Sequence, residues 1–226
     1  MISANLSVIN KRIARAAAAA GRAPEEITLI AVSKRQPREL ISQALTAGQL
    51  DFGENYLQEA EEKIKVITGP VRWHFIGRLQ SNKAKKAVRD FDLIHTVDRL
   101  KLARGLDRAA ASLGKKQKIL VQVNVGREAQ KGGVLAEKCQ ELLENLKTLA
   151  NLKVRGLMTM PPQVASGEEA RPYFAKLREL ADQMAGQGLL PATPALSMGM
   201  SGDFEAAILE GATMVRVGTA IFGARE

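Results

Sequence analysis

The sequence is poor in the residues that build disulfides and transition-metal sites. Its 226 residues include one cysteine and two histidines. A single cysteine excludes an internal disulfide and any CxxC metal or redox motif, which is compatible with a reducing cytoplasm. His74 and His95 share no recognisable zinc-ligand spacing, and the sequence has no G-x-S-x-G turn of a serine hydrolase. Because Cys139 falls on a helical stripe of leucines, we expect it in the core, and we expect no metal.

Acidic residues are scarcer than basic ones, 24 against 33, and the net charge of +9 favours an anionic partner, either a nucleic acid or a small ligand. Basic and aromatic residues mix in the segment 72–83, as they do on nucleic-acid surfaces. However, Trp73 and Phe75 alternate as core residues of a strand do, and the lysines that follow fit a solvated helix face. No apolar run approaches the roughly 18 residues of a membrane helix. We therefore expect neither nucleic-acid nor membrane binding.

Eight short apolar or β-branched runs alternate with amphipathic helical patterns along the chain. The predicted strands are Thr28–Ser33, Leu50–Gly53, Trp73–Gly77, Leu93–Val97, Lys118–Val125, Val154–Met160, Ala195–Gly199 and Met214–Ile221. The predicted helices are Pro37–Ala47, Tyr56–Ile67, Asn82–Asp90, Leu100–Leu113, Leu135–Leu149, Arg171–Ala185 and Gly202–Leu209. Helical connections of this kind join parallel strands of one sheet.

This alternation predicts an α/β fold, a single (β/α)8 barrel of the TIM type that spans residues 1–226 as one domain. Dividing 226 residues among eight units gives about 28 each, close to the roughly 30 of a βα unit. Leu6, Ile9 and Ile13 recur at helical spacing, which adds an N-terminal helix packed on the barrel. The alternative is an open doubly wound sheet, but the glycine-rich nucleotide fingerprint of that fold follows none of the strands.

In such a barrel the functional face lies at the carboxyl ends of the strands. Lys34 follows the first predicted strand, where partial desolvation lowers the pKa of a lysine and makes its amine a nucleophile for carbonyl compounds. The alternative is a lysine that reaches solvent or pairs with a carboxylate. Asn55 closes the second strand, either as a ligand contact or as the N-cap of the next helix.

The last two units carry small residues that favour an anion. Ser197 lies in the segment 196–202, and Gly218 and Thr219 close the eighth strand, where barrels of this type bind phosphate. Helix caps and tight turns are the alternative explanation for these serine and glycine residues. Arg216 lies within an apolar strand, so we expect its guanidinium to face an internal acceptor.

Taken together, these segments resemble the pyridoxal phosphate homeostasis proteins over the whole length of the chain. The resemblance rests on Ala31–Lys34 (AVSK), Phe52–Tyr56 (FGENY), His74–Lys83 (HFIGRLQSNK), Gly156–Met160 (GLMTM), Leu196–Ser201 (LSMGMS) and Val215–Gly223 (VRVGTAIFG).

The resemblance implies a barrel similar to the N-terminal domain of alanine racemase, with pyridoxal 5'-phosphate bound as an imine on Lys34. It implies phosphate contacts from Ser197, Gly218 and Thr219. It also implies that Arg216 faces the pyridine nitrogen and that Asn55 lies near the cofactor.

We therefore predict a protein that holds and delivers pyridoxal phosphate for vitamin B6 homeostasis and has no catalytic residues. Alanine racemases, whose N-terminal domain this chain resembles, have a second domain with a tyrosine base. This sequence ends after the eighth predicted strand, and Tyr56 and Tyr173 fall on predicted helices. The alternatives are a pyridoxal-phosphate-dependent racemase or decarboxylase, a lysine-imine aldolase and a basic nucleic-acid-binding module. We expect a cytoplasmic monomer, with apo forms of pyridoxal phosphate enzymes as recipients.

Overall fold

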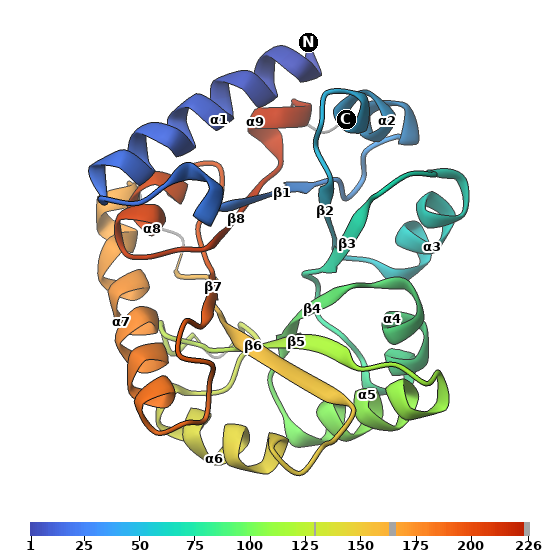
Figure 1. Ribbon diagram of the computed structural model, residues 1–226, viewed down its shortest axis with the longest axis vertical. Coiled ribbons are helices and arrows are strands. Elements are labelled where there is room, and N and C mark those ends of the chain that lie inside the picture. Colours follow the sequence, from blue (N-terminus) through green and yellow to red (C-terminus); the bar gives the residue numbers. More distant parts are fainter. Residues whose placement is uncertain (129, 163–165, 224–226) are drawn as a thin grey trace.

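The computed structural model describes residues 1–128, 130–162 and 166–223. The last three residues of the predicted domain 1–226, together with residues 129 and 163–165, lie outside the described residues. Within the described part of the chain, eight parallel strands close into a barrel in sequence order (Figure 1). The strands are β1 (Thr28–Val32), β2 (Asp51–Glu54), β3 (Arg72–Phe75), β4 (Leu93–Val97), β5 (Gln117–Gln122), β6 (Leu152–Met158), β7 (Ala195–Ser197) and β8 (Met214–Val217). The predicted (β/α)8 barrel is confirmed.

Helices surround the barrel on its outside (Figure 1). They are α1 (Ile2–Ala19), α2 (Arg38–Thr46), α3 (Leu57–Val66), α4 (Ala84–Asp90), α5 (Leu100–Ser112), α6 (Ala136–Leu146), α7 (Gly167–Gly186), α8 (Phe204–Leu209) and α9 (Thr219–Phe222), with short 3-10 turns at Pro24–Glu26 and Ser81–Lys83. The predicted N-terminal helix is α1, which buries Leu6, Ile9 and Ile13 and packs against α8 and α9. No helix among the described residues is both long and apolar enough to cross a membrane.

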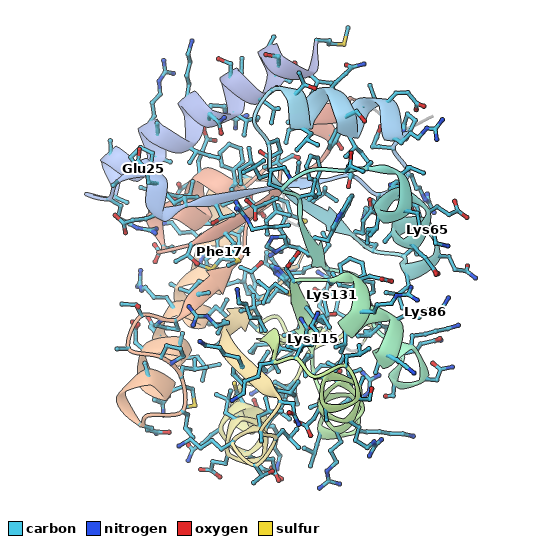
Figure 2. The ribbon with its side chains drawn as sticks, turned by 45° about the vertical axis from the view of Figure 1, so that its right-hand side comes forward. Glu25, Lys65, Lys86, Lys115, Lys131 and Phe174 are labelled. Atoms are coloured by element: carbon cyan, nitrogen blue, oxygen red, sulfur yellow. The ribbon has the colours of Figure 1, made fainter. Side chains whose placement is uncertain are left out.

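The main core lies between the strands and the helices. Trp73 and Phe75 of β3 are buried in it, as the alternation predicts, and so is Cys139 of α6, where burial raises the pKa of the thiol to about 12. Phe174 of α7 is fully buried, whereas Lys65 and Lys86 extend into solvent (Figure 2). These two lysines therefore lie on the outside of the fold, and the aromatic side chains of β3 stabilise its interior.

Six of the eight strands end earlier than their apolar patterns indicate, and two of them end three or more residues earlier. The eighth strand stops at Val217 rather than Ile221, because the chain turns at Gly218 and the Ile221 amide bonds the Gly218 carbonyl at 2.9 Å. The fifth stops at Gln122 rather than Val125. Beyond it, the Asn124 side chain accepts the Glu128 amide at 3.2 Å and holds a turn in place of the ladder. Both corrections shorten the wall of the barrel at its carboxyl end, where the cavity described next opens.

Candidate functional site

A cavity of about 280 Å³ lies at the carboxyl ends of the strands. Five of the six residues predicted for the site line it. They are Lys34 after β1, Asn55 after β2, Arg216 of β8, and Gly218 and Thr219 at the start of α9. The sixth, Ser197, is absent from its lining and is fully buried. Ser201 and Gly202 line the cavity on the β7 side instead.

The backbone on both sides of Lys34 is held from α3. Lys63 is buried and donates hydrogen bonds from Nζ to the Ser33 carbonyl at 2.7 Å and to Glu59 Oε1 at 2.6 Å. The same Glu59 oxygen accepts the Arg35 amide. Arg35 has φ of 57°, a left-handed conformation that costs a non-glycine residue energy. We call Lys63 and Glu59, with their bonds to Ser33 and Arg35, the clamp. The clamp fixes the turn that carries Lys34 at the end of β1.

A buried carboxylate completes the clamp. Glu54 Oε1 accepts hydrogen bonds from Lys63 Nζ and from the Ser33 hydroxyl, both at 2.7 Å. Burial raises the pKa of Glu54, and the Lys63 ammonium and Ser33 hydroxyl oppose that shift. Lys63 Nζ donates hydrogen bonds to Ser33, Glu54 and Glu59. Because all three of its N–H groups are used in this way, Lys63 does not compete with Lys34 as a nucleophile in this arrangement.

Arg216 is buried and finds the internal acceptors that its position in an apolar strand requires. Its Nη1 donates to Ser197 Oγ at 2.7 Å and its Nη2 to the Thr159 carbonyl at 2.9 Å. Burial lowers the pKa of the guanidinium to about 10, an effect that the Asp203 carboxylate opposes. The side chain therefore remains a cation at neutral pH, with its orientation fixed.

Behind Arg216, a chain of hydrogen bonds runs down the inside of the barrel. Ser197 Oγ lies 2.9 Å from His95 Nδ1, and His95 Nε2 lies 3.0 Å from His74 Nδ1. His74 Nε2 lies 3.0 Å from Asp51 Oδ1 at the other end. A connected polar network of buried side chains on the barrel strands thus anchors the guanidinium.

The two ends of this chain constrain the direction of its hydrogen bonds. Arg216 can only donate and the Asp51 carboxylate can only accept, so when each ring carries one proton, every group in between donates toward Asp51. Burial lowers the pKa of His95 well below its usual value, with smaller contributions from His74 and Arg216, which keeps the ring neutral. Ser197 Oγ bonds both His95 Nδ1 and Arg216 Nη1, and that hydroxyl is therefore committed to the protein interior.

The cavity has room and polarity for an anion with a polar ring. A Cβ added at Gly202 would meet nothing within 4 Å, so the backbone there is open to a ligand. Asn55 does not cap α3, whose N-cap is Tyr56, and its buried Oδ1 has no hydrogen-bond partner among the described residues. An orphaned acceptor beside a lysine, an arginine and the N–H groups of small residues fits a phosphorylated carbonyl compound. No three metal-binding side chains gather in the described ranges.

The residues that support this site could not be identified from the sequence. Ser201 and Gly202 belong to the segment 196–202, but choosing them over Ser197 requires knowing that β7 ends at Ser197. Apart from the Lys63–Glu59 pair, which joins residues four positions apart on α3, the clamp and the histidine chain join residues 9 to 102 positions apart. No local pattern predicts these longer-range contacts.

Comparison with known proteins gives a consistent result. A family model described as the N-terminal domain of alanine racemase matches residues 4–226. A protein named pyridoxal phosphate homeostasis protein from Pseudomonas aeruginosa is 46% identical over 226 residues, covering 100% of this chain and 96% of that protein. One of the same name from Escherichia coli K12 is 43% identical over 231 residues, covering 100% and 97%.

Solved structures share the fold. PipY of Synechococcus elongatus, with PLP (pyridoxal 5'-phosphate) bound, has a TM-score of 0.87 at 38% identity and covers 99% of this chain and 100% of its own. An alanine racemase from Clostridium difficile has a TM-score of 0.75 at 19% identity and covers 99% of this chain and 56% of the racemase. At that identity the racemase shows a common fold and nothing more.

Proposed function

This chain belongs to the family of pyridoxal phosphate homeostasis proteins, and we propose on that premise that it binds pyridoxal 5'-phosphate and hands it to other proteins without catalysis. The observation that carries the proposal is one cavity with a lysine amine on one side and the open backbone of two small-residue loops on the other. A small molecule that carries both an aldehyde and a phosphate could react with the amine and bind the loop backbone at the same time.

Each group of the cofactor has a candidate partner in the cavity wall. Lys34 would link the aldehyde, a step in which the amine nitrogen forms a C=N bond and one water leaves. Ser201, Gly202, Gly218 and Thr219 would bind the phosphate, with Ser201 in the place first assigned to Ser197. Asn55 Oδ1 would accept a hydrogen bond from the ring hydroxyl, and Arg216 would face the ring nitrogen.

Arg216 supports a holder rather than a catalyst. When bound to an enzyme, pyridoxal phosphate supplies an electron sink whose strength depends on protonation of its ring nitrogen. A guanidinium can only donate a hydrogen bond, so it favours the unprotonated nitrogen and a weak sink. Tyr56 does not line the cavity, so its phenol supplies no base at that wall for removal of an α-proton.

The cellular assignments follow from the same premise. We infer that the protein acts as a cytoplasmic monomer and that its recipients are apo forms of pyridoxal phosphate enzymes. The single cysteine supports a reducing compartment.

The test separates holding from turnover. Titration with pyridoxal phosphate should produce an absorbance band of the lysine-linked cofactor, which borohydride abolishes. The loaded protein is then incubated with L-alanine in deuterated water, and α-deuterium incorporation, racemisation and decarboxylation are followed. We expect the band and no turnover above the free cofactor. Rapid turnover that disappears in Lys34→Ala would establish the racemase or decarboxylase alternative, and absence of the band would refute cofactor binding.

A further inference from the structure

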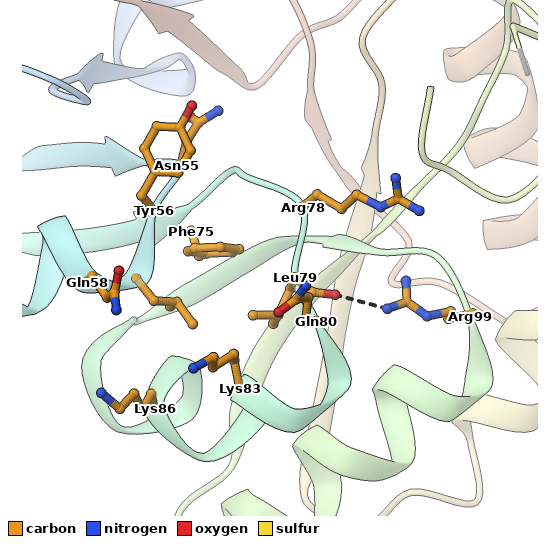
Figure 3. A pocket seen from close by; sticks show the side chains of 11 residues that line it. Asn55, Tyr56, Gln58, Phe75, Arg78, Leu79, Gln80, Lys83, Lys86 and Arg99 are labelled. Carbon is orange, nitrogen blue, oxygen red and sulfur yellow. Dashed lines mark hydrogen bonds between the residues drawn. The ribbon is translucent and has the colours of Figure 1, made fainter. Parts of the chain in front are cut away.

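A second, larger cavity of about 550 Å³ opens on the same face of the barrel, beside the cofactor cavity. We call it the basic groove, and its polar lining consists of Gln58, Arg78, Gln80, Lys83, Lys86 and Arg99, together with Asn55 and Tyr56. Figure 3 shows Lys83 and Lys86 toward one end, the guanidinium groups of Arg78 and Arg99 toward the other, and Leu79 and Gln80 between them. Positive charge therefore flanks the groove at both ends.

The charge of the groove is only partly neutralised. No aspartate or glutamate is among its lining residues. Lys86 bonds Glu61 at 2.9 Å and Arg99 bonds Asp98 at 2.5 Å, both acids lying outside the lining. Among the described residues, the side chains of Arg78 and Lys83 form no ion pair. The groove thus presents two uncompensated cations and two that are shared.

The middle of the groove suits an extended chain better than a compact ion. The Gln58 and Gln80 amides can both donate to and accept from a peptide backbone. Phe75 and Leu79 beneath them are nearly fully buried, so they form an apolar floor. Nucleic acid is disfavoured because Tyr56 is the one lining aromatic exposed for base stacking, at 47%. A small anion is disfavoured because exposed cations bind single charges weakly.

The two cavities share one residue, Asn55. A chain lying in the basic groove would therefore run along the edge of the cofactor cavity. The net charge of +9 would steer an acidic partner toward this protein.

We propose that the basic groove docks an extended acidic segment of a partner protein. The docking stands on the groove alone, whereas its use in handing over the cofactor rests on the proposed function. Carboxylates of the segment pair with Arg78 and Lys83 at the two ends, and its backbone bonds the glutamine amides.

Fluorescence anisotropy tests the docking with a fluorescein-labelled peptide of alternating Glu and Ala, about 12 residues and roughly 40 Å long when extended. The groove variant carries Arg78→Glu and Lys83→Glu. The matched control carries Lys116→Glu and Lys153→Glu, which change the net charge equally. Both control lysines are exposed, and they lie at the start of β5 and β6, on the opposite end of the barrel.

We expect the wild type and the control to bind the peptide, and the groove variant to bind about tenfold more weakly or worse. Binding should weaken between about 0.05 and 0.3 M salt. Equal loss in both variants, or no wild-type binding, would overturn the proposal. So would full competition by succinate or inorganic phosphate, which would indicate a small-anion site, and tighter binding of a single-stranded oligonucleotide. The absorbance band of bound pyridoxal phosphate, measured in each variant, tests the proposed function separately and should be unchanged.

Discussion

Lys63 Nζ lies 2.7 Å from the backbone oxygen of Ser33, the residue that precedes Lys34. A buried lysine on α3 thus supports the turn at the end of β1, and the site proposed for the cofactor link depends on a second lysine that does not line the cofactor cavity. Because this ammonium also holds Glu54 and Glu59, its removal would leave two carboxylates without their cation.

Lys63→Met should therefore destabilise the fold by about 3–5 kcal/mol, the cost of removing one partner of a buried ion pair. Urea unfolding with and without pyridoxal phosphate measures the change. Lys65→Met is the matched control, because Lys65 lies two residues further on the same helix, is 67% exposed, and should cost less than about 0.5 kcal/mol. A loss as small in Lys63→Met would show that the clamp does not hold the strand end.

Substitutions of Ser197 and Ser201, two serines of one segment, should have different effects, the first on stability and the second on cofactor binding. Ser197→Ala leaves the buried Arg216 Nη1 and His95 Nδ1 without their partner and should cost about 1–3 kcal/mol in urea unfolding. Ser201→Ala should leave stability unchanged and weaken pyridoxal phosphate binding by about tenfold or more, the value of a hydrogen bond to a charged group. The opposite pattern would restore Ser197 as the phosphate contact.

Stability should fall with acidification through the titration of His95. Its pKa in the folded protein lies well below the usual 6.5 because the ring is buried. Below pH 6.5 the His95 ring binds a proton in the unfolded chain but not in the native state. The free energy of unfolding therefore falls as pH falls, with a limiting slope of about 1.4 kcal/mol per pH unit. Above that pH the contribution is fully present.

The comparison that isolates this effect is His95→Gln, which has no titrating ring. Unfolding free energies from pH 7 to pH 5 should fall more steeply in the wild type than in the variant, by about one proton. Glu54, whose pKa is raised, acts in the opposite direction but is common to both proteins. Identical slopes would show that His95 does not remain neutral.

Residues at the carboxyl ends of strands could be identified from the sequence because that position needs no knowledge of side-chain contacts. Lys34, Asn55 and Arg216 each close or lie within an apolar run, and the barrel brings all three to one cavity. Ser197 shows the limit of predicting site residues from their position at a strand end. It is the last residue of β7, and its hydroxyl points to His95 of β4, a partner 102 residues away that only the closed barrel provides.

The same limit explains the clamp and the groove. Lys63 reads as one charge among several on a helix face, and its burial follows from the packing of α3 against the end of β1. The basic segment 72–83 reads as strand core followed by a solvated helix. That prediction is correct for Trp73 and Phe75, yet the segment also supplies Arg78 and Lys83 to a cavity that loops after three strands enclose.

The assignment of Lys34 has the most direct test. Freshly purified protein is loaded with pyridoxal phosphate, reduced with borohydride, digested and mapped by mass spectrometry, alongside Lys34→Ala. The account predicts that the dominant adduct lies on Lys34, that Lys63 is unmodified, and that Lys34→Ala loses the absorbance band while retaining weak binding through the phosphate. A dominant adduct on any other lysine of the wild type would contradict it.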